Sequence, residues 1–165
     1  MGILSLTRSH GFVVFLGAAV LFVAAQIQIP LQPVPITLQT MGVMILGLLF
    51  EKKAAMQAVL LYITLGIVGL PVFAGFSTLF TVGARAGYLV GFVLAVWAMT
   101  SARERLSLLG LNLLGTVIIY ACGIAWLSVF LGCEQAILVG LMPFLFSGAI
   151  KVFLLAGAVR YIRGM

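Results

Sequence analysis

The sequence predicts an all-α integral membrane protein, a compact bundle of six transmembrane helices with both termini in the cytoplasm. Three observations lead to this fold class. The chain of 165 residues is 64% hydrophobic and only 7% charged, with a mean hydropathy of +1.33, whereas a soluble domain carries roughly 25% charged residues. Its apolar residues form continuous segments without the alternation that marks a β-barrel. Its basic residues gather in alternate connections between those segments, as the positive-inside rule describes.

Six apolar segments account for the predicted helices. A helix needs about 20 residues to cross the hydrocarbon, so the second and third segments are short and must extend into their flanking loops or lie against neighbouring helices. The first could pass for a signal peptide, but similar segments continue along the chain, and we therefore expect an uncleaved first span. The predicted helices of this single transmembrane domain, 1–165, cover residues 11–26, 38–50, 54–68, 87–102, 106–131 and 136–160.

The basic residues orient the bundle. In a six-helix protein, seven of the nine lysines and arginines fall on one side of the membrane, and by the positive-inside rule that side is cytoplasmic. The net charge of +6 is therefore an orientation signal in a protein surrounded by membrane lipid. Nucleic acid is not an expected partner, because the sequence offers no soluble basic face. The seven residues are Arg8, Lys52, Lys53, Arg103, Arg105, Arg160 and Arg163.

The outward connections are longer and richer in proline than the cytoplasmic turns. "QIQIPLQPVPITLQ" (26–39) holds three prolines and four glutamines, and "GLPVFAGFSTLFTVGARAG" (69–87) follows the third helix. A third connection, "GCEQ" (132–135), is shorter. Fixed proline φ angles reduce the entropy lost when a loop is ordered. We expect the two long loops to form the two halves of a gate over an outward-facing cavity.

Lys151 is the most costly residue to place in lipid. A lysine near the centre of a span costs about 2.5–3.5 kcal/mol on insertion scales. Its ammonium either reaches the interface along its apolar stem or lies in a cavity, where it awaits an anion or a hydrogen-bond acceptor. No acidic residue lies inside a predicted span, because Glu51, Glu104 and Glu134 are all at boundaries. That absence favours an external anionic ligand.

Further candidates flank the cavity end of the predicted helices. Arg85 lies between Gly83 and Gly87 and suits either a lipid phosphate or a ligand carboxylate, which its planar fork can bind with two hydrogen bonds. Polar residues within helices serve more often as contacts between helices than as ligand contacts; the candidates of this kind are Thr37, Gln39, Tyr88 and Asn112. The loop residues Phe73 and Phe76 either dip into lipid or cover an apolar ligand.

No combination of residues with catalytic chemistry occurs in the sequence. There are no paired carboxylates in a span, no histidine cluster and no nucleophile–base set, so neither an enzyme nor a metal site is expected. The two cysteines, Cys122 and Cys133, imply neither a metal site nor a disulfide. An ATP-binding motif is also missing. Uphill transport would therefore need partners or an ion gradient.

Three blocks of the sequence resemble the BioY family, the biotin-binding S components of energy-coupling factor (ECF) transporters. They are "IPLQPVPITLQTMGVMILGLLF", "LLYITLGIVGLPVFAGFSTL" and "GARAGYLVGFVLA", which match in order and spacing. The resemblance implies six helices, outward loops that close over biotin, and no enzymatic activity. It implies no cofactor, since biotin is the transported ligand. It also implies partners: a transmembrane coupling protein and a pair of ABC-type ATPases.

The sequence departs from the family pattern in three places. The family's Pro-Gly-Asp-x-x-Lys resembles residues 146–151, in which Lys151 is kept but the aspartate position is Gly148. Arg85 stands where Gly-Pro-Thr-Gly-Gly-Tyr has threonine. The small residues spaced four apart in the first helix, which dock S components on the coupling protein, are degenerate here. The candidates for this docking are Gly17, Ala18, Ala24 and Ala25.

The residues and the resemblance together give the hypothesis of biotin capture from the extracytoplasmic side. An S component for a different vitamin, a small membrane enzyme acting on lipid and a subunit without ligand are the alternatives. We expect four kinds of contact with the ligand. Two residues in helices make deep polar contacts, aromatic residues pack on the ligand, residues of the first loop close the cavity, and an arginine binds the ligand carboxylate. The predicted substrate-binding residues, in that order, are Lys151 and Asn112; Tyr88, Phe73 and Phe76; Thr37 and Gln39; and Arg85.

Overall fold

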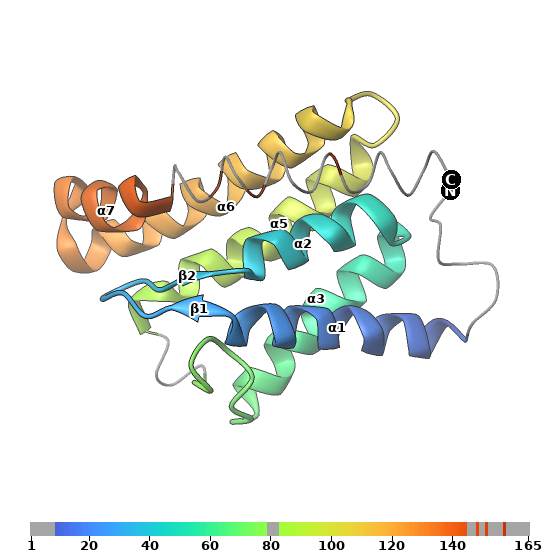
Figure 1. Cartoon of the computed structure of the whole chain (residues 1–165), viewed down its shortest axis with the longest axis horizontal. Coiled ribbons are helices and arrows are strands. Elements are labelled where there is room, and N and C mark those ends of the chain that lie inside the picture. The colour runs from blue at the N-terminus through green and yellow to red at the C-terminus, as the bar shows by residue number, and fades with distance from the viewer. Residues whose placement is uncertain (1–8, 79–82, 145–147, 149–150, 152–156, 158–165) are drawn as a thin grey trace.

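Six helices and one short β-hairpin make up the described part of the chain. The computed structural model describes residues 9–78, 83–144, 148, 151 and 157, and Figure 1 shows their helices running along the long axis of the molecule. For these residues the predicted all-α fold with six helices is confirmed. The elements are α1 (His10–Gln26), α2 (Gln39–Leu49), α3 (Lys52–Ile67), the 3₁₀ turn η1 (Gly83–Arg85), α5 (Ala86–Ser101), α6 (Leu108–Leu131) and α7 (Cys133–Gly140).

The proline-rich connection between α1 and α2 is a two-stranded antiparallel ribbon. Strand β1 (Gln28–Ile29) pairs with β2 (Ile36–Thr37), and the Leu38 amide donates to the Ile27 carbonyl at 3.1 Å. The prolines occupy residues 30–35, between the strands, where no ladder hydrogen bond needs a donor; the peptide before Pro33 is cis. The connection is thus an ordered hairpin at one end of the bundle, here called the hairpin end.

The last predicted helix begins earlier than expected and is interrupted. Helix α7 starts at Cys133, so the expected loop at 132–135 is reduced to Gly132, whose φ of +79° suits glycine. The helix ends at Gly140, and helical geometry resumes at residues 142–144. Residues 148, 151 and 157 are also helical, and the rest of the predicted segment 136–160 lies outside the described residues.

Helices approach one another at glycines. A side-chain carbon on Gly91 of α5 would lie 2.9 Å from the Ile119 Cα of α6, and one on Gly17 of α1 would lie 2.6 Å from the Ala58 Cβ of α3. The small residues of α1 are therefore used inside the protein. Of the four that the resemblance suggested for docking, all are buried: Gly17, Ala18, Ala24 and Ala25.

The exposed face of helix α6 consists mainly of large apolar residues, and its buried face carries polar and small residues beside Leu111, Ile119 and Leu127. Soluble proteins show the reverse pattern, whereas a helix in lipid buries its polar residues against its neighbours. Among the described residues, two segments are long and apolar enough to cross a membrane, Gly83–Ser101 with 19 residues and Leu108–Leu131 with 24. The buried face of α6 includes Asn112, Gly115, Tyr120 and Gly123; the exposed face includes Leu113, Val117, Val129 and Phe130.

We predict that Gly91→Ala destabilises the protein, because the added methyl group would meet the backbone of Ile119. Overpacking of this kind costs about 1–3 kcal/mol, which should lower the apparent melting temperature in detergent by roughly 3–10 °C. The matched control is Gly11→Ala, where nothing lies within 4 Å of the new carbon. Equal melting temperatures for the two variants would contradict the close approach of α5 and α6.

Candidate functional site

A cavity lies at the hairpin end of the bundle, between the hairpin, the start of α5 and a short connecting segment. Thr37, Gln39 and Thr40 line one side of it. The cavity has a volume of about 60 Å³, which is room for a few water molecules. Residues 72–77, here called the lid segment, lie over the cavity and contribute Phe73, Ala74 and Ser77 to its lining.

A continuous chain of hydrogen bonds supports the polar side of the cavity. The Lys151 Nζ donates to the Thr37 carbonyl at 2.6 Å and to the Thr40 Oγ1 at 3.4 Å. The Thr37 hydroxyl donates to the Gln39 Oε1 at 3.3 Å. The Gln39 Nε2 then donates to the Tyr62 hydroxyl at 2.7 Å, which donates to the Val72 carbonyl at 3.1 Å. The chain thereby ties the hairpin and α2 to α3 and to the lid segment.

The opposite side of the cavity is aromatic. The Tyr88 ring of α5 occupies the space that a side chain at Gly123 would need, and its hydroxyl donates to the Gly140 carbonyl at 2.9 Å. Phe92, four residues further along α5, lies on the same face and also lines the cavity, as does Tyr120 of α6. The three rings give the cavity an apolar wall suited to an apolar ligand body.

Tyr120 meets the position at which the resemblance leads one to expect an aspartate. A side-chain carbon on Gly148 would lie 2.9 Å from the Tyr120 hydroxyl oxygen. That hydroxyl also donates to the Phe144 carbonyl at 3.4 Å, and Phe144 lines the cavity. A hydroxyl group, and not a carboxylate, therefore occupies this part of the site.

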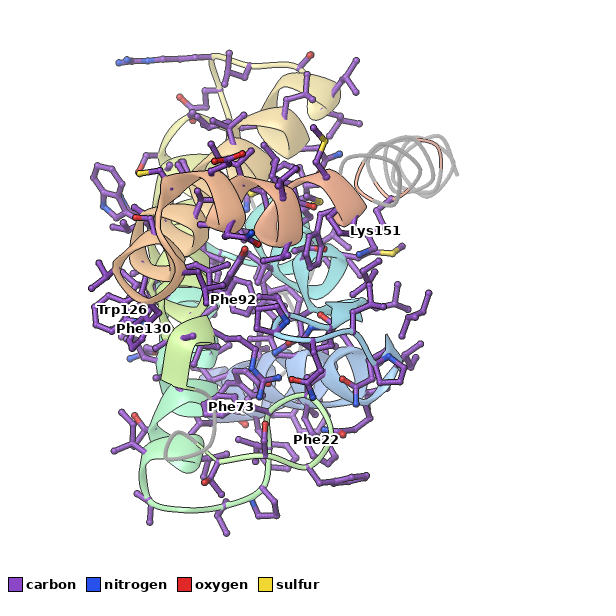
Figure 2. The ribbon with its side chains drawn as sticks, turned by 90° about the vertical axis from the view of Figure 1, so that its left-hand side faces the viewer. Phe22, Phe73, Phe92, Trp126, Phe130 and Lys151 are labelled. Carbon is purple, nitrogen blue, oxygen red and sulfur yellow. The ribbon has the colours of Figure 1, made fainter. Side chains whose placement is uncertain are left out.

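The cavity wall carries positive charge without a carboxylate beside it. Arg85 is half-buried and lines the cavity, and Lys151, only 6% exposed, lies directly behind the lining residues Thr37 and Thr40. Figure 2 shows Lys151 reaching toward α2. The chain has three acidic residues, and within the described residues none of them lines the cavity. An anion is therefore the ligand group that this wall favours.

The structure brings most of the predicted site residues together. Arg85, Tyr88, Phe73, Thr37 and Gln39 line the cavity. Their contact with a ligand stays a prediction.

Three predicted site residues lie outside the lining. Lys151 does not line the cavity, but its Nζ donates a hydrogen bond to the carbonyl of Thr37, which does. Phe76 is 65% exposed and packs edge-on against Phe22 at 6.4 Å between ring centroids. Asn112 is fully buried near the other end of α6, and neither of its side-chain polar atoms has a partner within the described part of the chain.

Nine of the fourteen lining residues were not among the predicted site residues: Val34, Pro35, Thr40, Ala74, Ser77, Leu89, Phe92, Tyr120 and Phe144. Phe92 could have been found, because residues four apart share a helix face and Tyr88 is a predicted site residue. The others depend on tertiary contacts, which carry no signal in a single sequence. Gln26 was also missed; its amide bonds the lid segment.

Comparison with known proteins identifies the family of the chain. The family model that matches the chain is that of the BioY family, over residues 4–165. The chain belongs to the BioY family. It is 31% identical to the probable biotin transporter BioY of Rickettsia prowazekii, covering 92% of this chain and 82% of that protein. It is 37% identical to the biotin transporter BioY of Thermotoga maritima, covering 84% and 86% of the two chains.

A solved structure shares the fold. The crystal structure of the S-component for biotin from an ECF-type ABC transporter superposes with a TM-score of 0.80. The match covers 94% of this chain and 91% of the other at 24% sequence identity. The chain is thus a multi-pass membrane protein with the fold of an S component.

We predict that Trp126 positions Arg85. The Trp126 Nε1 donates to the Gly83 carbonyl at 3.2 Å, and Gly83 opens the 3₁₀ turn that carries Arg85. In Trp126→Phe the ring remains but the donor is lost, so amide hydrogen exchange in residues 83–86 should become faster by roughly two- to fivefold. Trp97→Phe is the control, because Trp97 contacts Lys52 at the opposite end of the bundle. Unchanged exchange in Trp126→Phe would contradict this role.

Proposed function

We propose that this BioY-family protein binds biotin in the cavity at the hairpin end and acts as the S component of an ECF-type transporter. It captures biotin on the extracytoplasmic side and releases it inward. The observation that carries the proposal is the half-buried Arg85 in an aromatic cavity whose described lining has no carboxylate. Biotin matches this cavity, because it joins a carboxylate on a flexible chain to an apolar thioether ring and a ureido group that donates and accepts hydrogen bonds. The curated relatives quoted above carry biotin transport in their names.

Each predicted site residue has a proposed role. Arg85 binds the ligand carboxylate through its guanidinium fork. Tyr88 and Phe73 pack on the apolar body of the ligand. Thr37 and Gln39 offer hydrogen bonds at the polar wall. The remaining three act at a distance from the present lining: Lys151 as the deep polar contact, Asn112 as a second deep contact and Phe76 at the outer surface of the lid segment.

Transport needs partners, because the proposed cycle moves the vitamin inward at the expense of ATP. We propose that a transmembrane coupling protein and a pair of ABC-type ATPases supply this energy, with both termini of this chain on their side of the membrane. The protein itself has a binding role without catalysis, and biotin is its cargo and not a cofactor. Membrane lipid covers the exposed apolar faces of the helices.

An S component for a different vitamin is the second candidate. The observation that favours it is Gly148, where the family resemblance leads one to expect an aspartate and the Tyr120 hydroxyl fills the space. A hydroxyl group can donate and accept hydrogen bonds but does not supply the negative charge of a carboxylate. The polar group bound at this point could therefore differ from that of biotin.

Calorimetric titration of the detergent-solubilised protein separates the two candidates. We expect saturable binding of biotin with a stoichiometry of about one and no heat of binding for thiamine or riboflavin. Tight binding of another vitamin without biotin binding would replace the leading proposal with the alternative. No binding of any vitamin would contradict both.

The role of Arg85 is tested by a double-mutant cycle in which the ligand supplies the second change. Replacing the biotin carboxylate with a neutral amide removes the anion, and Arg85→Ala removes the cation. A hydrogen bond to a charged group contributes about 1.5–3 kcal/mol, so each change alone should weaken binding roughly ten- to hundredfold. The two changes together should weaken binding little more than either change alone. Lys151→Ala should weaken the binding of both ligands by the same factor. Additive losses for Arg85 would rule out its contact with the carboxylate.

A further inference from the structure

The lid segment is a small, internally bonded unit. The Phe73 amide donates to the Ser77 carbonyl at 3.0 Å, and the Ser77 amide donates to the Phe73 carbonyl at 3.3 Å. The Ser77 hydroxyl also donates to the Ala74 carbonyl at 2.8 Å. At its tip, Gly75 and Phe76 have φ values of +69° and +53°, which close the turn. These bonds keep the geometry of the lid segment fixed, so it can move as one piece.

The side chain of Gln26, the last residue of α1, forms hydrogen bonds with the backbone on both sides of the turn in the lid segment. Its Nε2 donates to the Phe73 carbonyl at 3.2 Å and to the Val72 carbonyl at 3.4 Å. Its Oε1 accepts from the Phe76 amide at 3.2 Å. A primary amide presents donors and an acceptor in one plane, so this one group bonds backbone atoms on both sides of the turn.

One of the three residues that Gln26 bonds, Phe73, lines the cavity. The Phe73 ring lines it from above, lies in the space that a side chain at Gly66 would need, and meets the Tyr62 ring edge-on at 5.3 Å. In Figure 2, Phe22 lies beside the lid segment that carries Phe73. The bond from Gln26 to the Phe73 carbonyl therefore sets how far this ring reaches over the cavity.

We infer that Gln26 is the positioning residue that holds the lid segment closed over a bound ligand. The lid segment covers one side of the cavity, so it must move when a ligand enters or leaves there. The lid segment can rotate about Val72, whose carbonyl accepts a hydrogen bond from the Tyr62 hydroxyl. This rotation requires the hydrogen bonds from Gln26 to Phe73 and Phe76 to break. Release of the ligand is then limited by the loss of these bonds. This inference rests on the proposed function.

The test compares two glutamines given the same substitution. Gln26→Met keeps the length of the side chain and removes its donors and acceptor. Gln57→Met is the control, because Gln57 is exposed on α3 and its Oε1 bonds the His10 Nε2 at 2.5 Å, away from the cavity. With radiolabelled biotin, we expect dissociation from Gln26→Met to be roughly five- to thirtyfold faster than from the parent. The association rate should change far less, and both rates should stay at parental values in Gln57→Met.

A second variant separates positioning from a general loss of packing. Gln26→Glu retains an acceptor for the Phe76 amide but places a carboxylate against the carbonyls of Val72 and Phe73. We expect biotin dissociation at least as fast as from Gln26→Met, while amide exchange at Phe76 in the ligand-free protein stays slow in Gln26→Glu and speeds up in Gln26→Met. If Gln26→Met does not fold, Gln26→Glu carries the comparison of dissociation rates.

The outcomes separate the inference from the proposed function. Parental protein that binds biotin, with an unchanged dissociation rate in Gln26→Met or in Gln26→Glu, overturns the role of Gln26. Parental protein that does not bind biotin overturns the proposed function. In that case the amide hydrogen exchange of Phe76 still tests the hydrogen bonds between Gln26 and the lid segment. Equal exchange rates in the parent and in Gln26→Met would contradict these bonds.

Discussion

The cavity depends on the chain of hydrogen bonds that runs from Lys151 through Thr37, Gln39 and Tyr62 to Val72. Lipid supplies no partners for polar groups, so each of them must be satisfied within the protein. This requirement draws together segments that are distant along the chain: Lys151 and Thr37 are 114 positions apart. Because the same bonds fix the hairpin, the start of α2 and the beginning of the lid segment, the polar wall of the cavity forms as a consequence of satisfying buried polar groups.

The aromatic wall has a different origin, in which rings fill the space left by glycines. Phe73 lies over Gly66, Tyr88 over Gly123, and the Tyr120 hydroxyl beside Gly148. A glycine allows a ring from a neighbouring helix to approach the backbone, so the rings are fixed without any large movement of the helices. At Gly148 this has a chemical consequence, because a neutral hydroxyl occupies the space of a side chain that would carry negative charge in an aspartate. Arg85 and Lys151 therefore dominate the electrostatics of this cavity.

The sequence was sufficient for the fold class and for five of the fourteen residues that line the cavity, since these follow from local patterns. Continuous apolar segments predicted the helices, and the position of Arg85 between two glycines and the outward position of Thr37 and Gln39 indicated the cavity. It was not sufficient for the hairpin, whose strands are only two residues long, or for the beginning of α7, which follows from the backbone of Gly132. Gln26 and Tyr120 could not be selected either, because their importance comes from partners that are 46–50 and 24 positions away.

The two walls differ in how easily they can move, and this difference determines where a ligand enters. The wall formed by α5 and α6 is held at backbone distance along Gly87 and Gly91, so opening it would separate two long helices. The lid segment is joined to its neighbours by the amide of Gln26, the hydroxyl of Tyr62 and the Phe73 ring, and it needs no helix to unfold when it moves. Local opening proceeds where few bonds must break. The lid segment is therefore the more mobile wall, while the α5–α6 wall keeps its shape and carries Tyr88, next to Arg85 of η1, as the fixed side of the cavity.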